Sequence, residues 1–413
     1  MTDPKFISTR SKPSILIVTS SYPPSRDGTA RLFGNAAEFL GGKGFSVTVV
    51  TRLSGKAAPF ERVKGVTVTR LPSSTSLFGK LVFLTKCSVA IATAIREGRG
   101  DLIHSAGTTA LAASVLGSLN TRPILVTFPG LPSESLRSGD PQRVVKARAR
   151  RVLRVLALFP RFLTVPAKGA VAPVAELCGR RSIGKIRYIP NPIDVAKFSP
   201  SGRAQAKGQF PEILVVGGLR SRKGVGTLLQ ALPTILRSYP ALRLTLVGGG
   251  SFGPALERQI EELGIRDSIR WAGEVSDDQL IEIYEQCDMV VVPSLAGGEA
   301  FGYVVAEAMC MRKPVIASAT PGPMEIISEA SCGVVFPPGD SKALAARIIE
   351  VAGDEKRRLL LGENGRRYAV EHFEIGKVMA QFEELYESAA GGWVDPDLLD
   401  GRAVKANSPE RGK

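Results

Sequence analysis

The sequence predicts an α/β protein made of two successive doubly wound domains, each a parallel sheet with helices on both faces. Three observations lead to this fold class: short apolar, β-branched segments recur along the chain, helical patterns separate them, and the alternation restarts near residue 211. Strands of a parallel sheet are buried on both faces, so they form continuous apolar runs joined by helices. A length of 413 residues also exceeds one compact core and fits two or three domains.

The first domain is expected over residues 14–190. Its strands are predicted, in chain order, at residues 15–20, 45–51, 66–71, 101–106, 123–129 and 162–167, and its helices at 30–41, 77–97 and 142–159. A linker is expected at 191–210, because the loop around Pro192 is followed there by a stretch rich in Gly, Ser, Gln and Lys.

The second domain is expected over residues 211–375. Its strands are predicted at residues 213–216, 242–247, 269–272, 289–293, 314–318 and 333–336, its late helices at 341–351 and 355–372, and a closing helix within 376–390. Residues 391–413 lack periodicity and are expected to be a disordered tail. Sheets of this kind bind ligands at the carboxyl ends of their strands, so the cleft between the domains is the expected site.

Composition excludes several classes of protein. With 44% hydrophobic and 23% charged residues the chain is globular. Its five cysteines are far apart and form no CxxC, which argues against a disulfide scaffold or a zinc site. Only two histidines are present, His104 and His372, so histidine-based metal chemistry is not expected. A polar amino terminus without an apolar signal core indicates a reduced, cytoplasmic protein.

The net charge of +15 is concentrated in one segment. Residues 141–187 hold twelve Lys or Arg and one acid, Glu176, which gives 12 − 1 = +11. On a helical wheel a basic stripe of Arg143, Lys146, Arg150 and Arg154 opposes an apolar stripe of Val145, Val152, Leu156 and Phe159. Such a helix either packs on the core with a solvated cationic side or docks on an anionic membrane. Nucleic acid is not an expected partner, because no recognisable binding module or interleaved aromatic residues accompany the charge.

Two strand-to-helix turns have the character of phosphate sites. The first, SYPPSRDGT, places Gly28 where a ligand can approach the backbone beside a helix N-terminus. The second, VGGLRSRKG, brings Arg220, Arg222 and Lys223 to one turn, and three cations there can neutralise a diphosphate. Each motif also has a plainer interpretation. The first can be a loop whose glycine is needed only for a positive φ, and the second can be a basic turn exposed to solvent.

A third motif, EAFGYVVAEAM, gives a more specific signal than the first two. Gly302 marks the turn into a helix, Glu307 falls in the second turn of that helix, and Glu299 precedes its N-terminal amides. Two carboxylates beside an amide-lined anion site suit a sugar joined to a phosphate. The plainer alternative makes Glu299 a capping acid and Glu307 a surface residue.

The order of these motifs resembles glycosyltransferase family 4, the group 1 glycosyltransferases of GT-B architecture, in which two Rossmann-like domains face each other across a cleft. The resemblance covers about residues 14–390 and runs through SYPPSRDGTA, YIPNPID, VVGGLRSRKG, LTLVGGG, AGEVSDDQL, VVPSLAGGEAFGYVVAEAM, KPVIAS, PGPMEII and GVVFPPGD. The combination of motifs is highly specific for this family, above all the Glu-x7-Glu element with its internal Phe-Gly and the later PPGD.

The resemblance implies a role for each motif. Gly28 would face the donor pyrophosphate, Lys223 with Arg222 beside it would bind donor phosphate, and Glu307 would bind the nucleotide ribose. Glu299 would hold hydroxyls of the transferred sugar, while the backbone of Phe301 and Gly302 contacts sugar and phosphate. No metal or cofactor is implied, and Asp277-Asp278 is interpreted as a helix start, not as a metal-binding pair.

Three positions depart from the family pattern. Gly218 stands where an Arg is common, Thr29 where a second Gly is common, and Pro129 where a His that reaches the sugar is common. The implied function is a retaining transfer of a sugar from a UDP- or GDP-linked donor to a hydroxyl acceptor, in glycolipid, polysaccharide or other glycoconjugate synthesis. The alternative is a degenerate GT-B protein that binds sugar nucleotide or a partner without turnover. A sugar-nucleotide epimerase is disfavoured by Glu-x7-Glu.

Overall fold

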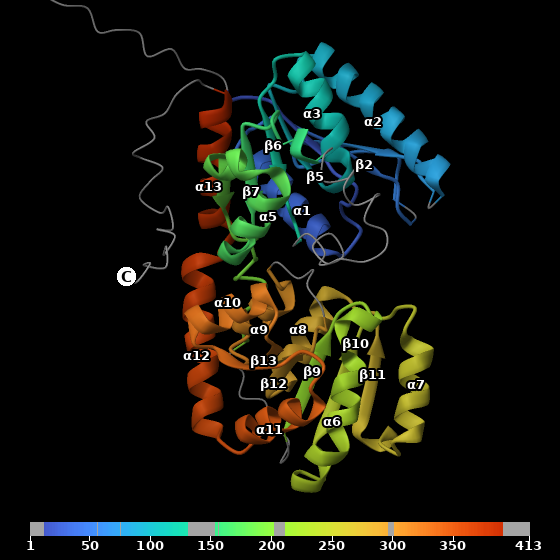
Figure 1. Cartoon of the computed structure of the whole chain (residues 1–413), viewed down its shortest axis with the longest axis vertical. Helices are drawn as coiled ribbons and strands as arrows, with labels where there is room; N and C mark the ends of the chain where they lie inside the picture. The colour runs from blue at the N-terminus through green and yellow to red at the C-terminus, as the bar shows by residue number, and fades with distance from the viewer. Residues whose placement is uncertain are drawn as a thin grey trace, which may run out of the picture.

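The computed structural model describes residues 12–55, 57–74, 76–130, 153–155, 157–201, 211–295 and 301–390. It contains two α/β domains stacked along the long axis of the molecule, the first above the second in Figure 1. An eight-stranded sheet forms the core of the first domain and a six-stranded sheet that of the second. The predicted fold class of two doubly wound α/β domains is therefore confirmed.

The first sheet has the strand order β3-β4-β2-β1-β5-β6-β7-β8. Its strands are β1 (Ile15–Val18), β2 (Val47–Arg52), β3 (Phe60–Val63), β4 (Val66–Leu71), β5 (Leu102–Ala106), β6 (Ile124–Thr127), β7 (Phe162–Val165) and β8 (Ile186–Tyr188). The helices beside it are α1 (Gly28–Gly42), α2 (Leu77–Arg96), α3 (Ala110–Leu119) and α5 (Val171–Cys178), with the 3-10 turns η1 (Gly107–Thr109), η3 (Lys168–Ala170) and η4 (Arg180–Lys185).

The sequence missed two strands of this sheet. Strand β3 pairs antiparallel with β4 at the sheet edge, so the expectation of a wholly parallel sheet was wrong there. Its four residues, FERV, are largely exposed and form no continuous apolar run. Strand β8 closes the other edge with only three residues, IRY. An exposed strand such as β3 and a strand as short as β8 both lack the buried apolar run by which strands are found from sequence.

The second sheet is wholly parallel, in the order β11-β10-β9-β12-β13-β14. Its strands are β9 (Glu212–Val216), β10 (Arg243–Val247), β11 (Ile269–Gly273), β12 (Met289–Val292), β13 (Val315–Ser318) and β14 (Gly333–Phe336). The helices beside it are α6 (Val225–Ser238), α7 (Gly253–Glu262), α8 (Asp277–Gln286), α9 (Tyr303–Cys310), α10 (Pro321–Ala330), α11 (Ser341–Ala352) and α12 (Glu355–His372), with η5 (Ser221–Lys223) and η6 (Arg266–Ser268). The direction of strand order reverses between β9 and β12, which makes their carboxyl ends a ligand-binding switch point.

Helix α8 begins as the adjacent acids predicted. Ser276 accepts a hydrogen bond from the Gln279 amide, and the Gln279 side chain accepts one from the Ser276 amide, which forms a capping box. Asp277 and Asp278 occupy the first turn, where carboxylates offset the helix dipole.

The last helix, α13 (Ile375–Ala390), returns to the first domain. Its side chains Val378, Met379, Phe382 and Tyr386 are buried with β1 and α1 in one hydrophobic core. In Figure 1 α12 runs beside the second domain and α13 beside the first, both on the left-hand side. The chain therefore crosses between the domains a second time near residue 374, in addition to the passage near residues 190–211.

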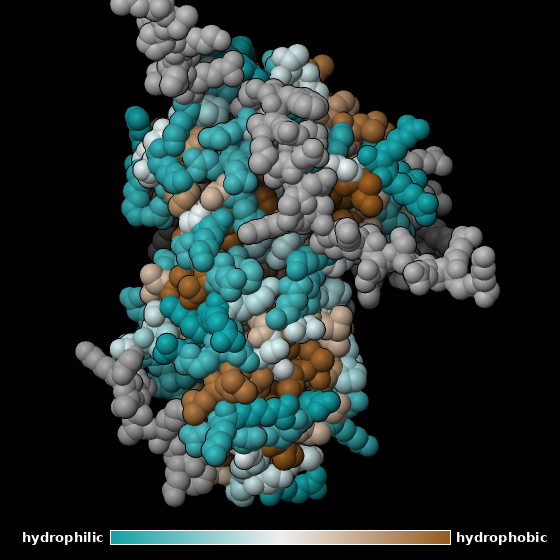
Figure 2. Space-filling view, turned by 90° about the vertical axis from the view of Figure 1, so that its left-hand side faces the viewer, coloured by the Kyte–Doolittle hydropathy of each residue, from teal (hydrophilic) through white to brown (hydrophobic). Residues whose placement is uncertain are grey.

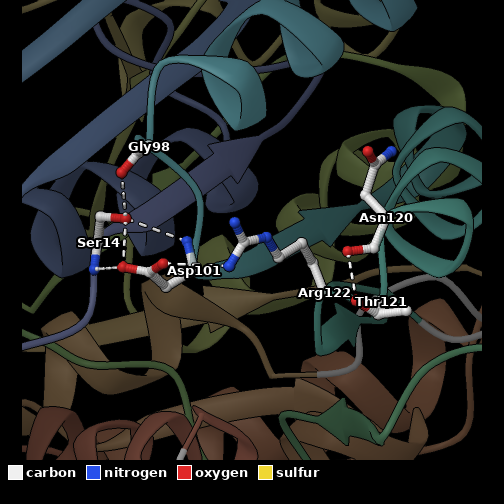
Figure 3. A network of polar contacts seen from close by, with 6 residues as sticks. All are labelled: Ser14, Gly98, Asp101, Asn120, Thr121 and Arg122. Carbon is white, nitrogen blue, oxygen red and sulfur yellow. Dashed lines mark hydrogen bonds and ion pairs between the residues drawn. The ribbon is translucent and has the colours of Figure 1, made fainter.

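The amino ends of the first sheet are held by a polar network (Figure 3). The Asp101 carboxylate accepts hydrogen bonds from the Ser14 amide at 2.9 Å and the Ser14 hydroxyl at 2.8 Å, and it pairs with Arg122 at 3.2 Å. The Asp101 amide donates in return to Ser14 Oγ at 3.0 Å. This network joins the residues that precede β1, β5 and β6, so it stabilises the sheet edge opposite to the expected binding edge.

Three features of the described residues concern contact with a membrane. Figure 2 views the side along which α12 and α13 run, where hydrophobic surface lies in separate patches among hydrophilic surface. No helix within the described ranges combines the length and apolarity needed to span a bilayer. Most of the predicted basic helix at 142–159 lies outside the described residues, including Arg143, Lys146, Arg150 and the apolar positions 145, 152 and 156. Within its described end, Arg154 is exposed, and so are Val155, Leu158 and Phe159.

Candidate functional site

The loop after β1 leads into the first turn of α1. Asp27 caps this helix, accepting hydrogen bonds from the amides of Thr29 at 3.0 Å and Ala30 at 3.1 Å. Gly28 is the first helical residue, and a Cβ there would lie only 3.1 Å from the ring of Tyr303, in the second domain. Arg26 also reaches the second domain, where it donates to the carbonyl oxygen of Val275. The loop that carries Gly28 therefore lies against the second domain.

The loops after β9 and β12 are joined to each other. The Leu295 amide donates to the Arg222 carbonyl oxygen at 2.9 Å. Gly224 has φ 67°, and a Cβ there would collide with the carbonyl oxygen of Pro293, so both the backbone shape and the close approach require glycine. The two loops thus form one surface at the switch point of the second sheet.

Lys223 lies half-buried on this surface, in η5. Burial, together with the nearby charges of Arg222 and Arg220, lowers the pKa of its ammonium group to about 8. Burial and neighbouring cations both disfavour the protonated form, so a bound anion would stabilise the charge on Lys223. Arg220 and Arg222 are thus close enough to Lys223 for their charges to affect it.

Helix α9 begins at the predicted glycine. Gly302 is its N-cap, with φ 85°, in the left-handed region where glycine is favoured. Phe301 is buried, and its ring packs edge-on against Tyr303 at a centroid distance of 5.5 Å and against Phe373 at 5.0 Å. Glu299 lies outside the described residues.

Glu307 is fully buried in the second turn of α9, so the alternative that it is a surface residue was wrong. Its Oε1 atom pairs with Nη1 of Arg31, from α1 of the first domain. Its Oε2 atom accepts a hydrogen bond from the hydroxyl of Tyr284, in α8, at 2.9 Å. A buried carboxylate requires such partners, because removal from water without compensation is costly.

These residues form an interdomain cluster: Gly28, Arg31, Tyr284, Tyr303 and Glu307. The Arg31 guanidinium also lies 5.7 Å from the centroid of the Tyr303 ring. The Tyr303 hydroxyl is buried and has no hydrogen-bond partner among the described residues. The cluster brings together two of the predicted site residues, Gly28 and Glu307, from opposite domains.

The surroundings of the two histidines and the five cysteines bear on whether the protein could hold a metal ion. His104 lies within β5, fully buried, with Nδ1 2.7 Å from the Tyr386 hydroxyl and Nε2 2.7 Å from Thr127 Oγ1. Burial lowers its pKa to about 3, so it is neutral at pH 7. His372 lies at the end of α12, 3.8 Å from the Glu371 carboxylate. All five cysteines are free and buried, and in the described part of the chain no three His, Cys, Asp or Glu side chains gather as a metal site.

Two protein-family models match this chain, one in each domain. The model described as Glycosyltransferase Family 4 matches residues 26–197. The model described as Glycosyl transferases group 1 matches residues 201–368. The two matched segments follow each other and meet at the passage between the sheets.

Curated relatives are similar over nearly the whole chain. A GDP-mannose-dependent alpha-(1-6)-phosphatidylinositol monomannoside mannosyltransferase of Mycobacterium tuberculosis is 26% identical over 390 residues, which covers 90% of this chain and 97% of the relative. A D-inositol 3-phosphate glycosyltransferase of Corynebacterium urealyticum is 26% identical over 86% of this chain and 89% of its own length.

Solved structures share the fold. A sucrose-phosphate synthase from Thermosynechococcus elongatus superimposes with a TM-score of 0.78 at 23% identity, covering 91% of this chain and 98% of the other. HepE from Anabaena, in complex with UDP, superimposes with a TM-score of 0.71 at 22% identity, covering 91% of this chain and 100% of the other.

Proposed function

This chain is a glycosyltransferase of family 4 with the GT-B fold, and from that premise we propose that it moves a sugar from a nucleotide diphosphate sugar to a hydroxyl acceptor with retention of configuration. One observation carries the proposal. Gly28 and Arg31 of the first domain contact Tyr303 and Glu307 of the second, where the loops after β1 and β12 meet. A donor held there would touch both domains.

Each site residue receives a proposed role. Lys223, assisted by Arg222, binds the donor diphosphate, and Gly28 faces it from the first domain. The amides at the start of α9, at Phe301 and Gly302, contact phosphate and sugar, as helix N-termini favour anions. Glu299 holds hydroxyls of the transferred sugar, and Glu307 holds the ribose diol.

The proposed chemistry relies on positioning and charge. The acceptor hydroxyl attacks on the face from which the diphosphate leaves, and a donor phosphate oxygen takes the acceptor proton. The protein stabilises the charge that develops on the leaving diphosphate, with Lys223 as the principal cation. We propose that this needs no metal or other cofactor.

The names of the relatives support a range of donors and acceptors. The Mycobacterium tuberculosis relative is named for GDP-mannose and a phosphatidylinositol mannoside, while the Anabaena structure holds UDP. We therefore propose a GDP- or UDP-linked hexose as donor. The proposed acceptor is the hydroxyl of a glycolipid, polysaccharide or other glycoconjugate precursor at the cytoplasmic face of a membrane.

A donor panel tests this function. Purified protein is screened by thermal shift against UDP- and GDP-sugars, and transfer or hydrolysis of the stabilising donor is then measured. Glu307→Gln, which keeps the shape of the side chain, should weaken donor binding by roughly ten- to a hundredfold, since a charge-assisted hydrogen bond contributes about 1.5–3 kcal/mol. Binding without transfer or hydrolysis would favour the degenerate, non-catalytic alternative. No stabilisation by any donor would reject the proposal.

We also propose reversible contact with anionic membranes through the basic helix. Val155, in the described part of the helix, and Leu158 and Phe159, in the turn that follows it, are exposed, which supports membrane contact over a helix packed wholly on the core. Each basic residue near an anionic surface contributes roughly 1 kcal/mol, so four suffice for reversible recruitment. Binding to anionic vesicles should fall steeply with added salt, because salt screens the attraction. It should disappear when Arg143, Lys146, Arg150 and Arg154 are all replaced by Gln. Equal binding to neutral and anionic vesicles at low salt would refute it.

A further inference from the structure

The partners of Glu307 conflict with its proposed role. Arg31 takes Oε1 and the Tyr284 hydroxyl takes Oε2, so protein groups already engage both oxygens. A ribose diol that binds this carboxylate must replace one of them. The partner that the ribose displaces from Glu307 is then the protein group that becomes free to contact the donor.

Arg31 is the partner that can leave. Tyr284 belongs to the same domain as Glu307, is fully buried and packs in the same hydrophobic core, so it moves with α9. Arg31 belongs to α1 of the first domain, and 27% of its side chain is exposed against 1% for Glu307. A small movement of the first domain therefore breaks the Arg31 contact and leaves the Tyr284 contact intact.

The released guanidinium lies beside the proposed phosphate subsite. It is 5.7 Å from the ring centroid of Tyr303, which is the first residue of α9 after the Gly302 cap. Gly28, proposed to face the diphosphate, is one helical turn before Arg31 in the same helix and contacts the same ring. A guanidinium binds phosphate with two parallel hydrogen bonds, which suits it to a diphosphate at this position.

The second domain supplies one cation fewer at its loop after β9 than the resemblance would lead us to expect. Its loop after β9 has Gly218 where the family often has Arg, and Gly218 contributes no side-chain charge. Arg31 would bring a guanidinium to the diphosphate from the opposite domain, in addition to Lys223. We propose that Arg31 is a donor-site residue of this enzyme that exchanges the Glu307 carboxylate for the donor diphosphate when the ribose binds Glu307. This inference rests on the proposed function.

The exchange predicts opposite effects on two ligands. Arg31→Gln removes the competitor for Glu307, so uridine or guanosine, which offer a ribose without phosphate, should bind about threefold more tightly. The same variant removes a phosphate-binding cation, so UDP or GDP should bind about tenfold more weakly. A merely structural role for Arg31 would move both affinities in the same direction.

The experiment measures the dissociation constants of the nucleoside and the nucleoside diphosphate for wild type, Arg31→Gln and Arg31→Lys, each checked for folding by thermal unfolding. Arg31→Lys keeps the charge and should recover part of the diphosphate affinity. Arg26→Gln is the matched control, since Arg26 crosses the same interface to the Val275 carbonyl oxygen and, among the described residues, forms no ion pair with Glu307; it should leave the ratio of the two affinities unchanged.

Three results would overturn the exchange: both ligands weaken together in Arg31→Gln, both tighten together, or neither changes. A different failure is visible in the wild type alone. If wild-type protein binds neither UDP nor GDP, the proposed function fails before any variant is compared, and the exchange fails with it.

Discussion

Single residues at the candidate site divide into those that sequence could find and those that it could not. Gly302 and Glu307 occupy the positions that the Glu-x7-Glu motif gave them, because a turn and the helix after it are local structure. The partners of Glu307 were missed. Arg31 is 276 positions away in sequence, and the contact exists only because two separate domains meet. One signal was available for Arg31: it lies one helical turn after Gly28, on the helix of the first phosphate motif.

Lys223 gives a prediction about pH. Its pKa of about 8 lies below the ordinary lysine value of 10.5, so it is half deprotonated near pH 8 and mostly neutral one pH unit above that. A bound diphosphate favours the charged form, and binding must then take up a proton. Nucleotide affinity should be flat below about pH 7, should start to fall as the pH approaches 8, and should fall by up to about tenfold per pH unit above it. Calorimetric titration with UDP or GDP between pH 6.5 and 9.5 measures this.

The Lys223 prediction has an internal control. Lys223→Met should abolish the pH dependence between pH 8 and 9.5 and lower kcat, because the charge on the leaving diphosphate is greatest in the transition state. Arg222→Gln keeps Lys223 and should keep the pH dependence. A pH dependence that survives in Lys223→Met would assign it to another group, and a rise in KM alone would remove Lys223 from the chemical step.

At the scale of elements, the six strands of the second sheet and the interior strands of the first were predictable, whereas the two edge strands of the first sheet, β3 and β8, were not. Strands β4 and β14 were predicted at their observed bounds, because both are bordered by turn signals and contain apolar, β-branched residues. Helix α13 was predicted as a closing helix, yet its return to the first domain could not be foreseen. The helix packs on an apolar surface that the rest of the chain leaves uncovered. That surface exists only once the first sheet and its helices have assembled, so the local sequence of the helix does not reveal it.

Helix α13 is tied to β5 by a buried hydrogen bond between Tyr386 and His104. Tyr386→Phe should lower the free energy of unfolding of the first domain by about 1–3 kcal/mol, because the His104 ring would lose a partner that water cannot replace. Tyr368→Phe is the matched control: its hydroxyl binds Glu329 near the surface, and its loss should cost under about 1 kcal/mol. Chemical denaturation with hydrogen exchange resolved by domain measures both. Equal losses in the two variants would contradict the buried tie.

At the scale of the molecule, the described residues place contacts between the domains in two regions. One is the interdomain cluster, and the other lies near the chain crossings. There the Glu325 carboxylate of α10 accepts hydrogen bonds from the amides of Lys168 and Gly169, in η3 of the first domain, each at 2.7 Å. We call these two hydrogen bonds of Glu325 the Glu325 clasp. The clasp and the two passages of the chain hold one side of the interface. Movement between the domains would then be concentrated at the interdomain cluster, where Arg31 and Glu307 separate.

Glu325 should therefore set how far the domains open. In Glu325→Ala the amides of Lys168 and Gly169 lose their acceptors, so their hydrogen exchange should accelerate by about tenfold or more, in line with about 1–3 kcal/mol for hydrogen bonds to a half-exposed carboxylate. The radius of gyration in solution scattering should rise, and KM for the donor should rise with it, because a looser pair of domains brings Gly28 and Lys223 together less often. Glu329→Gln is the matched control one helical turn later. It loses the ion pair with the Lys168 ammonium but leaves both amide contacts in place, and surface pairs of this kind contribute little. If Glu325→Ala leaves both amide exchange and scattering unchanged, the domains are held by the cluster itself, and the clasp has no part in donor closure.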